Sequence, residues 1–407
     1  MPQHPATDRL ALFAMLALFP GSFFYQLSVG LGLIPAFAGG YFGLACASIF
    51  VLLGVRYGFR TLGKLKVQPF DTAYLGFLLY FAGVAALNSL TKHDDEHLTW
   101  HLTAVIQCAT VYLIFKGMTG RSKAARRFIW LAVSGMTACI FYFMENGVFS
   151  IRAISGNTEN ISSYQGFALY YLICSIIAIK NIQTRTLRII SYPAVTYALY
   201  VNGARSEFVA LLIFIVTFEI CRSNFKSLSA TSAMILLLAI SATLYSGAVN
   251  LPENRVTRLL NLSEDNSSLV RNQISEQGFS RILDNPLLGD YGSYEKGYYI
   301  HNILSVWLDL GLLGFIYFLM LILIPLVLIG GKITLKGKSD AEHAFIFSSL
   351  VACLVLLIFG KYFTYLMLPA VLGYYSSALQ QITANPNNSV SRVKSDKLIG
   401  RDGKHPD

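Results

Sequence analysis

The sequence has little charge for its length. Of its 407 residues, 13% are Asp, Glu, Lys or Arg, about half the share found in ordinary soluble domains. By contrast, 54% are hydrophobic and the mean hydropathy is +0.53. This composition argues against a soluble globular domain, because that much apolar surface requires lipid as its solvent.

Several other signals are missing as well. The six cysteines all lie inside apolar runs and have neither metal-site nor redox spacing, so we interpret them as small hydrophobic residues and expect no metal and no cofactor. We see no convincing signal-peptide cleavage site and no internal repeat, which weakly disfavours inverted-repeat folds. The net charge of +10 does not indicate nucleic acid, because the basic residues lie between apolar runs, as topology and lipid headgroups require.

The sequence is rich in apolar runs of about the length that crosses a bilayer. We place them at 10–27, 37–55, 70–89, 99–116, 128–145, 164–180, 188–202, 206–221, 229–248, 302–330, 343–360 and 362–380. These runs predict an all-α, polytopic membrane bundle of about twelve transmembrane helices over residues 1–380. The polar, basic segment 381–407 is predicted to be a disordered cytoplasmic tail.

The distribution of basic residues predicts the orientation. The connections between successive runs lie alternately on the two sides of the membrane. The connections on one side hold 23 of the 32 Lys and Arg, and those on the other side hold the remaining 9. Cytoplasmic connections are the more basic ones. Both termini are therefore expected in the cytoplasm, and the long segment 249–301 is expected outside.

This outer segment predicts an amphipathic helix that begins at Arg271. Ile274, Gly278 and Ile282 would lie on one face, which Leu283 extends. Asn285 and Pro286 then end the helix and a turn follows.

Three outer arginines and a histidine are the candidates for chemistry. Arg205 lies between two apolar runs with almost no loop, where an unpaired cation is costly. Pairing with Glu207, or snorkelling to the headgroups, would explain it without any function. Arg271 and Arg152, each taken alone, look like ordinary solvated residues.

His301 lies at the start of the tenth run and is either a polar cap or a base that is neutral at ambient pH. Asp309, two turns further on, is expected to face a cavity or to pair within the bundle. Arginines at a membrane boundary suit a lipid-linked diphosphate, because guanidinium groups bind phosphate oxygens and stabilise a departing diphosphate. A histidine there can accept the proton of an attacking hydroxyl.

The order of these motifs resembles the O-antigen ligase and polymerase superfamily of bacterial envelope glycosyltransferases. The resemblance covers roughly residues 140–320. It comprises Arg-x-x-x-Gly-Asn (152–157), GlyAlaArgSer around Arg205, AsnProLeuLeuGly (285–289) after the Arg271 helix, and HisAsn-x-Leu followed by LeuGlyLeuLeuGly (301–314). The proline that is frequent in the family after Asn157 is absent.

The resemblance implies a bacterial inner-membrane enzyme whose active site faces the periplasm. The donor would be an undecaprenyl-diphosphate-linked glycan, transferred with inversion and without a metal. Arg205 and Arg271 would hold the diphosphate, with Arg152 assisting. His301 would activate the acceptor hydroxyl, oriented by Asn302.

Three functions remain open. A ligase would transfer O-antigen to the lipid A–core, whereas a polymerase would transfer it to another lipid-linked repeat unit. A transporter of lipid-linked sugars fits the same number of spans, although transporters usually place polar residues near the midplane, flanking broken helices.

Overall fold

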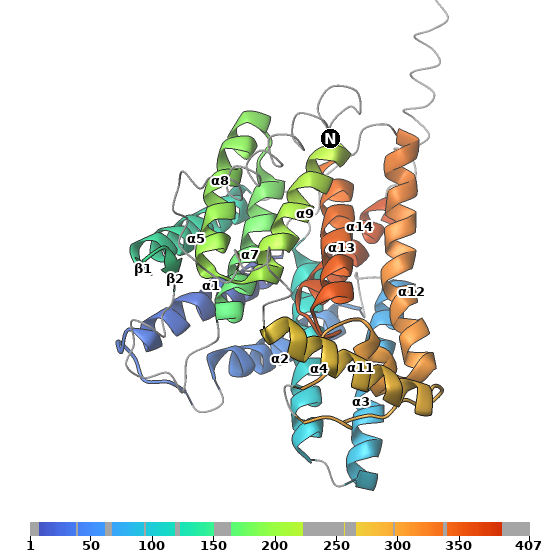
Figure 1. Ribbon diagram of the computed structural model, residues 1–407. Helices are drawn as coiled ribbons and strands as arrows, with labels where there is room; N and C mark the ends of the chain where they lie inside the picture. Colours follow the sequence, from blue (N-terminus) through green and yellow to red (C-terminus); the bar gives the residue numbers. More distant parts are fainter. Residues whose placement is uncertain are drawn as a thin grey trace, which may run out of the picture.

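The computed structural model describes residues 8–37, 40–61, 67–92, 95–118, 123–149, 164–222, 256, 266–295, 298–336 and 340–384. This described part of the chain is all-α apart from one short hairpin, as predicted (Figure 1). The helices are α1 (Arg9–Gly30), α2 (Tyr41–Thr61), α3 (Pro69–Lys92), α4 (Asp95–Gly117), α5 (Lys123–Tyr142), α7 (Tyr164–Asn181), α8 (Arg185–Asn202), α9 (Arg205–Arg222), α11 (Asn266–Asp284), α12 (Leu304–Lys336), α13 (Ala341–Phe359) and α14 (Met367–Ala384).

Six of the described helices are long and apolar enough to cross a membrane, namely α1, α3, α4, α5, α12 and α13. The prediction of a helical membrane bundle is therefore confirmed. Of the other predicted runs, the one at 229–248 lies outside the described residues. A count of twelve spans stays a prediction.

Several boundaries differ from the predicted runs, and the last run differs at both ends. The last run was expected to start at residue 362, but α14 begins at Met367, and residues 362–366 form a turn. Hydropathy could not distinguish this turn from the start of a helix, because Tyr362, Phe363 and Leu366 are as apolar as a helix face. The same helix continues to Ala384, past the expected start of the tail, whose remaining residues lie outside the described part.

The hairpin joins β1 (Met144–Glu145) to β2 (Val148–Phe149), directly after α5. Asn146 and Gly147 both have positive φ, which is the usual chemistry of a tight hairpin turn. The fifth run, predicted to reach residue 145, therefore ends three residues earlier, at Tyr142.

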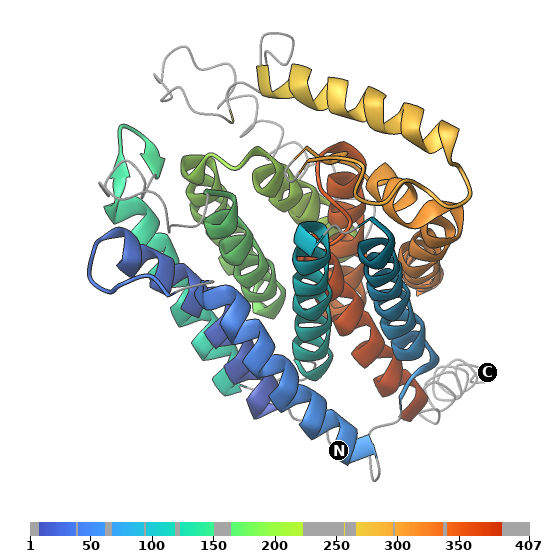
Figure 2. The ribbon, with the colours of Figure 1, turned by 90° about the horizontal axis from the view of Figure 1, so that it is seen from below.

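Helix α7 lies inside the bundle, with nearly every residue from Phe167 to Lys180 buried. It packs against α1, α5, α8 and α9, while α9 packs closely on α13 and α4 on α14. In Figure 1, α7, α9, α13 and α12 run side by side, and α11 crosses beneath them. Figure 2 shows α11 along one edge of the bundle rather than within it.

The inner face of α11 is largely the predicted one. Gly278 and Ile282 are buried against Ile300 and Leu308, and a Cβ at position 278 would collide with the Ile300 side chain. The expectation that Leu283 extends this face is wrong, because Leu283 is 62% exposed. The helix also starts at Asn266, ahead of Arg271.

Helix α12 is broken at Gly311, whose φ of 66° and ψ of −176° lie outside the helical region. The turn that follows α11 docks on this break: the Leu312 amide donates to the Leu287 carbonyl (3.2 Å) and the Asp290 amide to that of Leu308 (2.7 Å). Gly289 also has positive φ, and a Cβ at either glycine would overlap the backbone of the opposite segment. The two glycine-containing motifs thus form one joint between the outer segment and the bundle.

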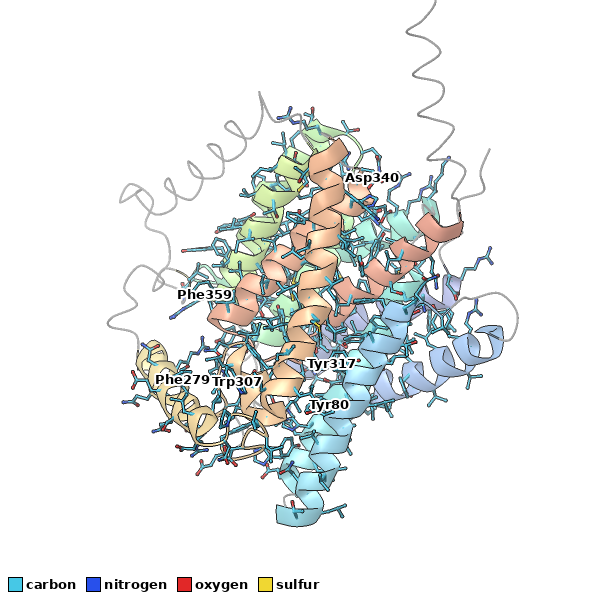
Figure 3. The ribbon with its side chains drawn as sticks, turned by 90° about the vertical axis from the view of Figure 1, so that its right-hand side faces the viewer. Tyr80, Phe279, Trp307, Tyr317, Asp340 and Phe359 are labelled. Carbon is cyan, nitrogen blue, oxygen red and sulfur yellow. The ribbon has the colours of Figure 1, made fainter. Side chains whose placement is uncertain are left out.

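Helix α3 supports the same joint from the other side. The Tyr80 hydroxyl donates to the Leu310 carbonyl (2.9 Å), and the Tyr317 hydroxyl donates to the Ala73 carbonyl (2.7 Å). Figure 3 shows both tyrosines where α3 lies beside α12, with Trp307 close to the α11 residue Phe279.

Candidate functional site

A pocket of about 430 Å³ opens where the ends of several helices meet. The contributing elements are α4, α7, α9, α11, the segment before α12 and the turn between α13 and α14. The lining residues are Trp100, Gln165, Gly166, Leu169, Ser206, Glu207, Arg271, Tyr299, His301, Gly360, Lys361, Tyr362, Thr364, Tyr365 and Leu366. All of these ends belong to the side that the basic-residue count assigns to the exterior.

The structure brings two of the predicted site residues into this pocket, His301 and Arg271. They come from the segment that precedes α12 and from α11, and the packing of Gly278 and Ile282 on Ile300 and Leu308 sets their separation. The guanidinium of Arg271 lies beside Gly360. A side chain from the outer helix therefore reaches the turn between α13 and α14.

Arg205 is the first residue of α9, next to the lining residues Ser206 and Glu207. Helix α8 ends at Gly203, whose left-handed conformation (φ 75°) lets the chain reverse with almost no loop. Arg205 itself is half-buried and is not among the residues that line the pocket.

Of the two other predicted residues, the structure describes only Asn302. The Asn302 side chain accepts from the Leu304 amide (2.8 Å), so it caps the start of α12. This bond holds the backbone next to His301. Arg152 lies outside the described residues.

Lys361 is a site residue that the sequence analysis did not single out. Its Nζ lies 2.6 Å from Glu207 Oε1, and Glu207 also accepts from Ser206 Oγ (2.9 Å) and the Tyr365 hydroxyl (3.2 Å). The Glu207 side chain is 1% exposed and that of Lys361 is 12% exposed. A signal was present: Lys361 is a lone cation between two apolar runs, which is costly unless it is paired or functional.

Electrostatics keep His301 neutral. Burial, with added repulsion from Arg271 and Lys361, lowers the pKa of His301 from 6.5 to about 4. The ring of Tyr299 also packs edge-to-face with the imidazole, and the two ring centroids are 4.4 Å apart. The pocket therefore holds a neutral imidazole beside two cations at ambient pH.

A buried hydrogen-bond network lies beneath the pocket. Tyr362, which lines it, donates to Asp309, and so does Tyr294 (2.8 Å). The Tyr362 oxygen also lies 3.0 Å from His101 Nε2, while His101 Nδ1 lies 2.6 Å from the Tyr291 hydroxyl.

These contacts fix one proton of the network. A tyrosine has one hydroxyl proton, and Tyr362 gives its own to Asp309, so His101 Nε2 must donate to Tyr362. Asp309 thus pairs within the bundle, one of the two outcomes expected for it, and anchors the pocket-lining turn to the first part of α12.

Among the described residues, no group of three or more His, Cys, Asp or Glu is arranged to hold a metal ion. The titratable groups that line the pocket are instead two cations, three tyrosines, one histidine and one carboxylate, beside the uncharged polar side chains of Gln165, Ser206 and Thr364. This set suits recognition of a multiply charged anion and proton transfer from a hydroxyl.

Comparison with known proteins finds no family model that matches the chain and no curated protein with detectable sequence similarity.

Proposed function

We propose that this membrane protein is a glycosyltransferase of the O-antigen ligase type, which transfers a glycan from undecaprenyl diphosphate to the lipid A–core. The observation that carries the proposal is the neutral His301 between Arg271 and Lys361, in a pocket at the ends of the membrane helices. The order of the motifs along the chain supports the same class.

In this proposal the diphosphate of the donor lies against Arg271 and Lys361, with Arg205 at the edge. The acceptor hydroxyl attacks the anomeric carbon. Its oxygen forms the new bond, the bond from that carbon to the diphosphate oxygen breaks, and the hydroxyl proton passes to His301. The two cations stabilise the negative charge that develops on the departing diphosphate.

In this scheme, binding of the donor raises the pKa of His301. A base with a pKa near 4 is neutral but weak, and the ideal base has a pKa near the working pH. A bound diphosphate offsets the charges of Arg271 and Lys361, which removes their repulsion and raises the pKa of the imidazole. The base would thus strengthen only when the donor is present.

The proposal includes a topology. Twelve spans would place both termini in the cytoplasm and the pocket at the periplasmic face of a bacterial inner membrane. The 23-to-9 distribution of Lys and Arg supports this arrangement.

A polymerase is the second candidate, since it uses the same donor chemistry with a lipid-linked repeat unit as the acceptor. A transporter is the third, and the break in α12 at Gly311, close to the buried Asp309, is the feature that favours it. Purified protein that transfers glycan in detergent, without any gradient, would exclude pure transport.

Deletion of the gene, followed by analysis of the envelope glycans, separates the first two candidates. Loss of a ligase leaves the core uncapped while long polymer accumulates on the carrier lipid. Loss of a polymerase leaves a core capped with a single repeat. Complementation with Arg205→Ala, Arg271→Ala and His301→Ala should fail, whereas wild-type glycan in all three strains would rule out the catalytic role of this pocket.

A further inference from the structure

A second pocket, of about 590 Å³, lies at the opposite end of α7 from the site described above. Gly166 of α7 lines the first pocket, whereas Asn181, at the other end of the helix, lines the second. At 1.5 Å per residue these two positions are roughly 22 Å apart along the helix axis. The two pockets are therefore separate, and the second is at the end that the basic-residue count assigns to the cytoplasm.

The lining of the second pocket combines two arginines with an apolar wall. Helix α5 contributes Arg126, Arg127, Trp130, Leu131 and Ser134. The turn between α7 and α8 and the first turn of α8 contribute Asn181, Ile182, Gln183, Thr184 and Leu187. None of the described residues that line it is a carboxylate. Leu131 and Leu187 are 68% and 57% exposed, so the apolar wall faces outward, where a membrane protein meets lipid.

The two arginines differ from their neighbours in pairing. Lys116, Lys180 and Arg188 lie at the same end of the bundle and form ion pairs with Asp71, Glu342 and Glu219 respectively. Among the described residues, no ion pair joins Arg126 or Arg127 to a carboxylate. Their charge is available to an anionic ligand.

We infer that this pocket binds an anionic glycerophospholipid of the adjacent leaflet. Its phosphate would lie between Arg126 and Arg127, and an acyl chain would lie along Leu131 and Leu187. Trp130, two turns into α5, has the position of an interfacial aromatic residue beside the headgroup. Basic pockets between transmembrane helices on the cytoplasmic side are suited to acidic headgroups. The inference is independent of the proposed transferase activity.

Native mass spectrometry of the purified full-length protein tests this inference, with phosphatidylglycerol and zwitterionic phosphatidylcholine as probes. We expect wild-type protein to retain phosphatidylglycerol preferentially. The double variant Arg126→Ala/Arg127→Ala should bind it about 30-fold more weakly, which corresponds to about 2 kcal/mol. A matched control, Lys123→Ala/Lys332→Ala, removes the same charge from the same end outside the pocket and should bind as the wild type does.

A second variant introduces a negative charge at Leu187, a residue of the apolar wall. Leu187→Asp places a carboxylate beside the guanidinium groups and should abolish the preference while the chromatographic profile stays that of folded protein. Equal binding of the two lipids by the wild type, or an unchanged preference in the arginine double variant, would overturn the inference. So would displacement of the lipid by soluble glycerol 3-phosphate at equal concentration, because the site would then recognise phosphate alone.

Discussion

Lys361 Nζ lies 2.6 Å from Glu207 Oε1, across the contact between α9 and the turn that follows α13. This ion pair lies in the wall of the pocket that holds His301. Glu207 fixes the position of a cation that the bound donor would share. The pair therefore has two roles, one in stability and one in binding, and substitutions can separate them.

The first prediction concerns this pair. Lys361→Met leaves a buried carboxylate without its cation, and Glu207→Gln leaves the cation without its carboxylate. Removing one partner of a buried pair costs about 3–5 kcal/mol of folding free energy. We expect a lower thermal midpoint for each single variant in a purified sample, and substantial recovery in the double variant.

Activity should follow a different pattern. Transfer should remain low in the double variant, because Lys361 is absent from the diphosphate site even though stability is restored. Double-variant activity equal to the wild-type value would show that Lys361 only supports the fold.

The second prediction is the pH dependence. Since the pKa of His301 is about 4 in the free protein, the imidazole is neutral above that pH and protonated below it. The pH profile of kcat/KM reports the pKa values of the free enzyme. We therefore expect kcat/KM to fall only as the pH drops through about 4, where His301 becomes protonated. The profile of kcat reports the complex, and its acidic limb should lie at higher pH because the diphosphate offsets the repulsion from Arg271 and Lys361.

Arg271→Gln provides the check on this assignment. It removes one of the two cations, so the acidic limb of kcat/KM should move upward, toward 6.5. Arg281→Gln is the matched control: it lies on the same helix, about 15 Å further along, and does not line the pocket. An equal movement in both variants would contradict a local effect on His301.

The third prediction concerns the joint between the outer segment and α12. Gly289→Ala and Gly311→Ala each place a Cβ against the opposite backbone at a positive φ, so each should cost more than about 1 kcal/mol of stability. The displaced turn should also move α11, and Arg271 with it, and raise KM for the donor. Gly331→Ala is the control, because nothing lies within 4 Å of its added Cβ. Proteolytic susceptibility of α11 in the three variants measures the difference.

The fourth prediction concerns the buried network. Tyr362→Phe removes the hydroxyl that donates to Asp309 and accepts from His101, and leaves two buried polar groups less satisfied. The expected cost is about 1–3 kcal/mol, measured as a lower thermal midpoint. Tyr298→Phe should have almost no effect, since Tyr298 is 57% exposed. Equal stability of the two variants would show that the network contributes little.

Much of the fold and part of the site could be predicted from the sequence. The apolar runs indicate membrane helices because only an apolar surface is stable in lipid. His301 and Arg271 could be found because each lies on the predicted outer side, which holds only 9 of the 32 Lys and Arg, next to motifs with local spacing. The inner face of α11 followed from its helical periodicity.

The other site features depend on contacts between distant parts of the chain. The pairing of Lys361 with Glu207 joins the turn after α13 to α9, and the His101–Tyr291 bond spans 190 residues, so no local pattern records either. The break at Gly311 lies inside a continuous apolar run, where hydropathy has no signal for it. Leu283 is hydrophobic but exposed, which amphipathic periodicity alone could not reveal.

The most direct test of the central claim is glycan transfer by purified protein in detergent, with an undecaprenyl-diphosphate-linked donor and a lipid A–core acceptor, followed over time on a gel. The wild type and Arg281→Gln should transfer glycan without any gradient, and His301→Gln and Arg271→Gln should be slower by at least about 100-fold. Transfer by His301→Gln and Arg271→Gln at the wild-type rate would contradict the assignment of this pocket as the active site.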